Sequence, residues 1–200
     1  MKTTKKRGRP KTFDREKVTN QAMNSFWKEG PSASLNSICE LAGIAKPSLY
    51  REFGNEDGLS LAALEIYFQL SFSQLETILF GSENFKVKLE TISNFLSRDS
   101  CNENGCLFIK MRADSSQLGP KTKAKVKEID RKILQLYTRF FKLSRKNGQW
   151  KSQLTDKEAA SFLSSQFELV LTQRARGVAS SDVEKVLQIS LSIIINSKSI

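Results

Sequence analysis

Histidine is absent from the 200 residues of the chain, and this absence excludes several kinds of chemistry. A protein without histidine has no Ser-His-Asp or Cys-His nucleophilic site, no histidine general base and no zinc site with a histidine ligand. Enzymes that act through lysine or carboxylate side chains remain, but the sequence has no P-loop, no dinucleotide-binding glycine pattern and no strand-rich segment to hold one. We therefore predict that the protein is not an enzyme and uses neither a metal nor a cofactor.

Cysteines and long apolar runs are also scarce. The three cysteines, an odd number, do not suit a disulfide framework and indicate reduced thiols. No stretch approaches the roughly 18 uninterrupted apolar residues of a membrane span, and the N-terminal residues lack the apolar segment of a signal peptide. These absences predict a cytoplasmic protein with no membrane partner.

Positive charge is what the chain has in excess. It carries 32 basic and 21 acidic residues, a net charge of +11, which suggests nucleic acid as partner first and an anionic membrane surface second. Residues 1–12 include six cations and no acid, so we expect a flexible basic arm. Its Arg7, Arg9 and Lys11 fit contacts with phosphates or a narrow A·T-rich minor groove, and the alternative is a solubilising tail.

Residues 34–59 contain two short helical patterns that meet at a tight turn. In the first, apolar residues recur at helical spacing and end at Leu41 or Ala42. Gly43 then supplies the left-handed backbone of a helix end, and Pro47 suits the first turn of the next helix. Two helices of this length around such a turn predict a helix-turn-helix, whose second helix enters a DNA major groove.

The second of these helices has a polar outer side. Leu49 and Phe53 are spaced to face the core, which leaves the polar residues for solvent or a polyanion. Beside the arm, the residues predicted to contact DNA are Ser34, Lys46, Pro47, Ser48, Tyr50 and Arg51. Glu52 could accept a hydrogen bond from cytosine or pair with a cation, but we expect it to face away from DNA.

This stretch resembles the N-terminal domain of the tetracycline-repressor (TetR) family of bacterial regulators. The matching residues are Ala22, Phe26, Gly30, Ile38, Gly43, Ile44, Ser48, Leu49, Tyr50, Phe53 and Leu59. Two departures are Glu56, where the family usually has a phosphate-contacting lysine, and Ala45, where a serine or threonine cap is common. The resemblance implies an all-α homodimer of about nine helices that binds a palindromic operator and represses transcription until a small-molecule ligand releases it.

The domains expected from this resemblance are the arm, a helix-turn-helix domain over residues 13–58, and a helical ligand-binding and dimerisation domain over residues 59–200. Asp14 and Asn55 are placed to cap helices, and capping boxes are expected at Thr155 with Glu158 and at Ser181 with Glu184. We predict later helices over residues 56–80, 85–97, 106–116, 156–176 and 182–196, and one after the break at residues 119–120. The 11 cations in residues 119–151 fit a solvated helix surface better than a ligand or DNA site.

The last two helical patterns are apolar on more than one face. A helix of this kind needs two neighbours, and we predict that the second is the same pair of helices in another subunit. The residues predicted at this dimer interface are Phe162, Val170, Leu187 and Ile194.

By analogy with the family, the effector would bind in a cavity inside the second domain. The residues predicted to line it are Phe68, Phe72, Leu107, Met111, Tyr137, Phe141 and Phe167. Cys101 and Cys106 flank a short loop that suggests a thiol switch, but without a nearby histidine we favour structural cysteines. The alternative to a ligand-responsive repressor is an activator, or a regulator or architectural protein that binds DNA without a ligand.

Overall fold

The computed structural model describes residues 13–98 and 104–195, and this part of the chain is helical with no strand. The predicted all-α class is therefore confirmed. Within these two ranges nine α-helices are joined by short connections, with 3-10 turns at Gly30–Ser32 and Ser115–Gln117. Within the described ranges, none of the helices combines the length and apolar composition that a membrane span requires.

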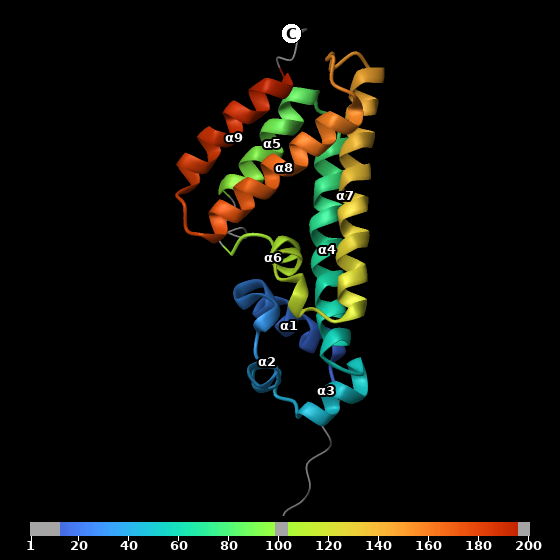
Figure 1. Ribbon diagram of the computed structural model, residues 1–200, viewed down its shortest axis with the longest axis vertical. Coiled ribbons are helices and arrows are strands. Elements are labelled where there is room, and N and C mark those ends of the chain that lie inside the picture. Colours follow the sequence, from blue (N-terminus) through green and yellow to red (C-terminus); the bar gives the residue numbers. More distant parts are fainter. Residues whose placement is uncertain (1–12, 99–103, 196–200) are drawn as a thin grey trace, which may run out of the picture.

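The first three helices form a small bundle at one end of the molecule (Figure 1). They are α1 (Arg15–Glu29), α2 (Leu35–Ala42) and α3 (Lys46–Phe53). Asp14 caps α1 as predicted, because its carboxylate accepts a hydrogen bond from the N–H of Lys17 at 3.0 Å. At the end of α2 Ala42 is the buried residue, whereas Leu41 is 60% exposed.

Two long helices run side by side along the length of the molecule (Figure 1). They are α4 (Glu56–Phe80) and α7 (Pro120–Lys146). The remaining helices are α5 (Phe85–Arg98), α6 (Leu107–Ala113), α8 (Asp156–Ala175) and α9 (Ser180–Ile195). Helices α5, α8 and α9 pack on one another at the far end, and α6 lies between them and the N-terminal bundle.

Besides the cap of α1, side-chain caps were predicted at three later helices, and the structure has two of them. Asn55 caps α4, and Thr155 and Glu158 form the expected capping box at α8. The box predicted at Ser181 is wrong, because α9 begins at Ser180. The Ala179 carbonyl already accepts hydrogen bonds from the backbone N–H groups of Asp182 and Val183, so the helix starts earlier and Ser181 lies inside it.

The buried apolar residues form two clusters along the molecule. The lower cluster joins α1, α2, α3 and the start of α4 to α6 and the first half of α7, and the upper cluster joins α5, α8, α9 and the rest of α7. Leu107, Phe108 and Met111 of α6 therefore share a core with the N-terminal bundle. The domain boundary expected after residue 58 stays a prediction, but it does not separate the two clusters.

Candidate DNA-binding face and ligand cavity

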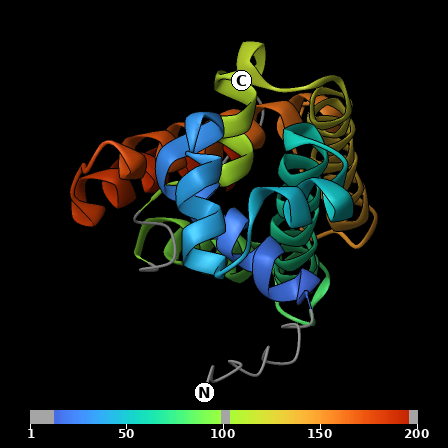
Figure 2. The same ribbon diagram turned by 90° about the horizontal axis from the view of Figure 1, so that it is seen from below.

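Helix α3 presents its polar side away from the rest of the molecule. Leu49 and Phe53 are 0% and 8% exposed and anchor the helix in the lower cluster. Lys46, Pro47, Tyr50 and Arg51 are exposed, and Ser48 is half-buried. Viewed from below, α2 and α3 lie at the near end of the molecule, where nothing in the described residues covers them (Figure 2). We call the side formed by these five residues the α3 face.

The turn before α3 has the geometry that the glycine and proline predicted. Gly43 has φ +68°, a left-handed conformation, and its N–H donates to the last carbonyls of α2. Ser34, the other residue of this region predicted to contact DNA, caps the start of α2, where its hydroxyl accepts from the N–H of Ser37 at 3.4 Å. Ala45 offers no side-chain cap to α3; Pro47 has no N–H and the Ser48 N–H donates to the Ala45 carbonyl, so in the first turn the Lys46 N–H is the group left to an acceptor.

Glu52 pairs with a cation on a neighbouring helix. Its carboxylate lies 2.8 Å from the Nε of Arg15, whose guanidinium lies 5.1 Å from the centre of the Phe53 ring. Both charged side chains are well exposed, so the pair adds little to stability. Of the alternatives open from the sequence, the structure supports pairing with a cation.

Glu56, the departure from the family pattern, lies beside the α3 face. The Tyr50 hydroxyl donates to its carboxylate over 3.5 Å, which is a weak contact between exposed groups. Glu56 is in the first turn of α4, where a negative charge is favourable to the helix. The tyrosine hydroxyl is thereby held at the junction of α3 and α4.

Asp57 joins the start of α4 to the start of α7, a link that the sequence patterns did not reveal. Its carboxylate accepts from the backbone N–H groups of Lys121 and Thr122, each at 2.9 Å, and from the Thr122 hydroxyl at 2.6 Å. It caps α7 from another helix, since Gly119 at the N-cap has no side chain. Partial burial raises the pKa of Asp57, but the hydrogen bonds from Thr122 and Lys121 and the Lys121 charge lower it further, to below its ordinary value.

Gly119 is required at this junction by close contact. A Cβ atom at this position would lie 2.3 to 2.6 Å from the side-chain atoms of Asp57, which is far inside van der Waals contact. The start of α7 can therefore approach α4 only because residue 119 is glycine.

A second link ties α1 to the segment around α6. The ammonium group of Lys110 donates to the carbonyls of Trp27 and Lys28 at 2.7 and 3.1 Å, which satisfies the end of α1. The indole N–H of Trp27 donates to the Gly105 carbonyl at 2.8 Å. Burial lowers the pKa of Lys110 from its ordinary value.

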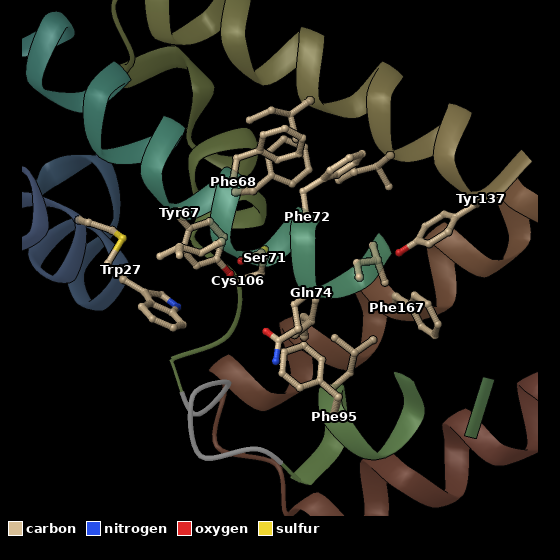
Figure 3. A pocket seen from close by; sticks show the side chains of 18 residues that line it. Trp27, Tyr67, Phe68, Ser71, Phe72, Gln74, Phe95, Cys106, Tyr137 and Phe167 are labelled. Atoms are coloured by element: carbon tan, nitrogen blue, oxygen red, sulfur yellow. The ribbon is translucent and has the colours of Figure 1, made fainter. Parts of the chain in front are cut away.

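A cavity of about 290 Å³ lies between the helices, next to α1 and the middle of α4 (Figure 3). Four of the predicted residues line it: Phe68, Phe72, Tyr137 and Phe167. Leu107, Met111 and Phe141 do not, and each is 0% exposed in a packed core. Phe141, for instance, packs against the rings of Phe85 and Trp150.

Several residues that line the cavity were missed in the sequence. Met23 and Trp27 come from α1, so the N-terminal bundle itself forms part of the wall. Tyr67, Ser71 and Cys106 meet on another side, where the Tyr67 hydroxyl is hydrogen-bonded to the other two side chains. No periodicity separates these residues from ordinary core positions, and only the tertiary fold brings them together.

Of the two described cysteines, Cys39 is buried and Cys106 is half-buried at the cavity wall. Cys39 is 6% exposed in the lower cluster, and burial raises the pKa of its thiol. Burial also raises the pKa of Cys106, so this thiol is protonated at neutral pH. Burial raises the pKa of the neighbouring Tyr67 well above its ordinary value. Cys101 lies outside the described residues, as do Arg7, Arg9 and Lys11.

The residues predicted at the dimer interface on α8 and α9 lie mostly inside the subunit, and their role between subunits stays a prediction. Val170, Leu187 and Ile194 are 2%, 1% and 0% exposed, because they pack inside their own subunit, and Phe162 is half-buried. The exposed apolar residues of these helices are Leu169, Val186, Ile189 and Ile193, with exposed fractions of 41%, 41%, 67% and 56%. The last three form one stripe on α9, which we call the α9 stripe.

Comparison with known sequences identifies the N-terminal region. A family model described as "Bacterial regulatory proteins, tetR family" matches residues 18–63. The chain is also 42% identical over 80 residues to the HTH-type transcriptional repressor ComR of Escherichia coli (strain K12). This match covers 40% of the chain and spans only 38% of that repressor's length.

Solved structures resemble the chain over nearly its whole length. The reduced form of E. coli NemR has a TM-score of 0.79 at 20% identity, covering 90% of this chain and 96% of that one. A cysteine mutant of the TetR-family regulator CifR, in complex with 26-bp operator DNA, has a TM-score of 0.77 at 23% identity, covering 92% and 98%. A TetR-family regulator from Cytophaga hutchinsonii reaches 0.81 at 14% identity, covering 93% and 95%. At these identities the likeness establishes the fold.

Proposed function

We infer, from the premise that this chain belongs to the TetR family of bacterial regulatory proteins, that it is a sequence-specific DNA-binding regulator, most simply a ligand-responsive repressor. The observation that carries the proposal is the α3 face, which holds cations and hydrogen-bonding groups in solvent on a helix anchored by Leu49 and Phe53. A net charge of +11 adds a general attraction to DNA.

In this proposal each α3 face enters a major groove. Arg51 and Lys46 reach guanine edges or phosphates, Ser48 can serve either, and Tyr50 contacts a phosphate. Ser34 and the uncapped start of α3 offer further groups to the DNA backbone. Arg7, Arg9 and Lys11 of the arm would follow the minor groove beside the site.

We propose that the working form is a homodimer built on α8 and α9. The α9 stripe, together with Leu169 on α8, supplies the apolar surface that a partner copy would cover. A two-fold dimer places two α3 faces about one DNA turn apart, roughly 34–36 Å or somewhat more, and so reads a palindrome.

The cavity is the proposed effector site, and its walls suggest how an effector would act. Trp27 and Met23 belong to α1, whereas Phe68 and Phe72 belong to α4, so a ligand would touch both helices that carry the helix-turn-helix. Because Asp57 of α4 is hydrogen-bonded to Thr122 of α7, a displacement of either helix would move the other. To release DNA the ligand must favour the conformation that cannot span both half-sites, and operator DNA must weaken ligand binding by the same factor.

Footprinting on the DNA upstream of the protein's own gene tests this function most directly. We expect protection of two symmetric half-sites, since two copies of α3 would contact equivalent bases. Shifting one half-site by five base pairs, about half a DNA turn, should abolish protection of the pair, and a ten-base-pair shift serves as the matched control. Uniform protection without a repeated half-site would count against sequence-specific binding by a dimer.

A further inference from the structure

The walls that the described residues give the cavity carry no charge. Among the 18 described residues that line it there is no Asp, Glu, Lys or Arg. Two cations lie behind the aromatic walls and already have partners: Lys132 lies 5.8 Å from the centre of the Phe68 ring and 2.6 Å from Glu128. Arg112, behind Phe108, pairs with Asp130 and Glu168. An ionised ligand would lose its hydration here without gaining a counter-charge.

The size and lining of the cavity suit two fused or linked rings. Its volume of about 290 Å³ is roughly twice that of an engineered cavity, about 150 Å³, that binds benzene. Aromatic side chains face it from several helices (Figure 3). They include three pairs in contact: Phe68 with Phe72 at 4.8 Å, Trp27 with Tyr67 at 5.2 Å and Tyr137 with Phe167 at 5.8 Å between ring centres. Such walls offer ring faces and edges that favour a flat aromatic guest.

Tyr137 supplies a buried polar group without a partner. The residue is 5% exposed, and no described residue forms a hydrogen bond with its hydroxyl, which points toward the inside of the cavity (Figure 3). By contrast, the Tyr67 hydroxyl is already bonded to Cys106 and Ser71. Burial raises the pKa of Tyr137, so its hydroxyl is protonated at neutral pH and can both donate and accept. The hydroxyl faces the cavity, so a ligand atom there can pair with it.

We propose that the cavity binds an uncharged two-ring aromatic molecule that carries one hydroxyl or carbonyl group, and that this group hydrogen-bonds to Tyr137. The inference rests on the proposed ligand-responsive function and specifies the chemical class of the effector. The rings occupy the space between α4 and α7 and touch Trp27 of α1.

Calorimetric titration of the full-length protein, without DNA, tests the charge requirement. Four probes share the same rings: 2-naphthylmethanol, 2-methylnaphthalene, 2-naphthoate and 2-naphthylmethylammonium. The neutral alcohol should bind at least about tenfold more tightly than either ion, because both ions would be buried unpaired. Equal or tighter binding of an ion overturns the proposal, and so does the absence of binding by all four probes.

The Tyr137→Phe variant tests the hydrogen bond. It should weaken binding of 2-naphthylmethanol about tenfold and leave 2-methylnaphthalene, which has no hydroxyl, unaffected. Thr138→Val is the matched control, since it removes a hydroxyl from the neighbouring residue of α7, which does not line the cavity, and it should change neither probe. An equal loss for both probes, or no loss for the alcohol, overturns the assignment of Tyr137.

The same samples separate this inference from the proposed function. Fluorescence anisotropy with the footprinted DNA, measured without any probe, reports whether the protein binds a specific site. Failure of site-specific binding contradicts the proposed function and leaves the probe affinities as a property of the cavity. Specific DNA binding together with a preference for the ionic probes contradicts only the ligand class.

Discussion

The α3 face and the cavity are built in opposite ways. The α3 face comes from one helix of 8 residues, and its important side chains are polar and exposed. The cavity draws its walls from six helices between Met23 and Leu171, and nearly all of its side chains are apolar. A site made from one segment can be predicted from the sequence of that segment. A site made from many segments exists only once the chain has folded.

The two regions should therefore respond differently to substitution. On the α3 face a change removes a contact with a partner and leaves the fold nearly intact, because exposed side chains there, such as Arg51, pack little against the core. In the cavity and the surrounding core, a change alters packing, so stability and binding change together. Four substitutions test this contrast, and their expected effects decrease from Phe141 to Asp57.

The largest loss of stability is expected at Phe141, which was predicted to line the cavity but lies in the packed core. Phe141→Ala should lower the free energy of unfolding by about 3–5 kcal/mol, because the 0% exposed ring packs against three other aromatic rings. Phe72→Ala, at the half-buried cavity wall, should cost less than half as much. Urea unfolding measures both. Equal losses would mean that the cavity wall is packed as tightly as the core.

A substitution in the α9 stripe tests whether this stripe forms the dimer interface that brings two α3 faces together. Ile189→Asp should weaken the dimer by about 2 kcal/mol or more, because Ile189 is 67% exposed in the subunit and would be buried only against a partner. Sedimentation velocity measures the loss of dimer, and Gln188→Asp on another side of α9 is the control. A dimer unchanged by Ile189→Asp would require a different interface.

The α3 face should lose affinity without losing stability. Arg51→Ala should weaken operator binding by about 1–3 kcal/mol and relax preference at one base of each half-site. A phosphate contact would instead weaken all sequences alike and reduce the salt slope by about 0.9. Fluorescence anisotropy measures the affinity, with Lys142→Ala, an exposed cation at the other end of α7, as control. Unchanged operator affinity would remove Arg51 from the interface.

The smallest effect concerns Asp57, which lies between the two regions. Asp57→Ala should lower stability by about 0.5–2 kcal/mol near pH 7, as loss of a helix cap does. Since the folded pKa of Asp57 is below its ordinary value, the contribution of its carboxylate is present at neutral pH and is lost as pH falls through that folded pKa. The difference between Asp57→Ala and the natural protein should therefore shrink below about pH 4 in urea unfolding. A constant difference across this range would show that the carboxylate charge contributes nothing.

Local sequence signals predicted local structure well. The caps at Asp14, Asn55 and Thr155 and the turn at Gly43 are where the sequence placed them, because each depends on residues within one helical turn. The helix-turn-helix follows from such signals. The roles of individual side chains of the α3 face on DNA stay predictions.

Sites that depend on packing could not be predicted to the same degree. In α9 Leu187 and Ile194 face the subunit core while Ile189 and Ile193 face outward, and both sets have the same chemistry. The sequence shows two apolar stripes but not which one meets the core. The cavity poses the same difficulty, since Phe72 at its wall and Phe141 in the core differ only in where the fold places them.

The lower cluster also bears on how such proteins can be recombined. Leu107, Phe108 and Met111 complete the core of the N-terminal bundle, and the indole of Trp27 completes a wall of the cavity. A chimaera that joined residues 1–58 to the second half of another protein of this fold would divide both the lower cluster and the cavity wall between two sequences. Its new junction would bury mismatched surfaces along α1, α4 and α6. In this chain the portable module is thus larger than the helix-turn-helix, and a successful graft would have to carry α6 and the first turns of α7 with it.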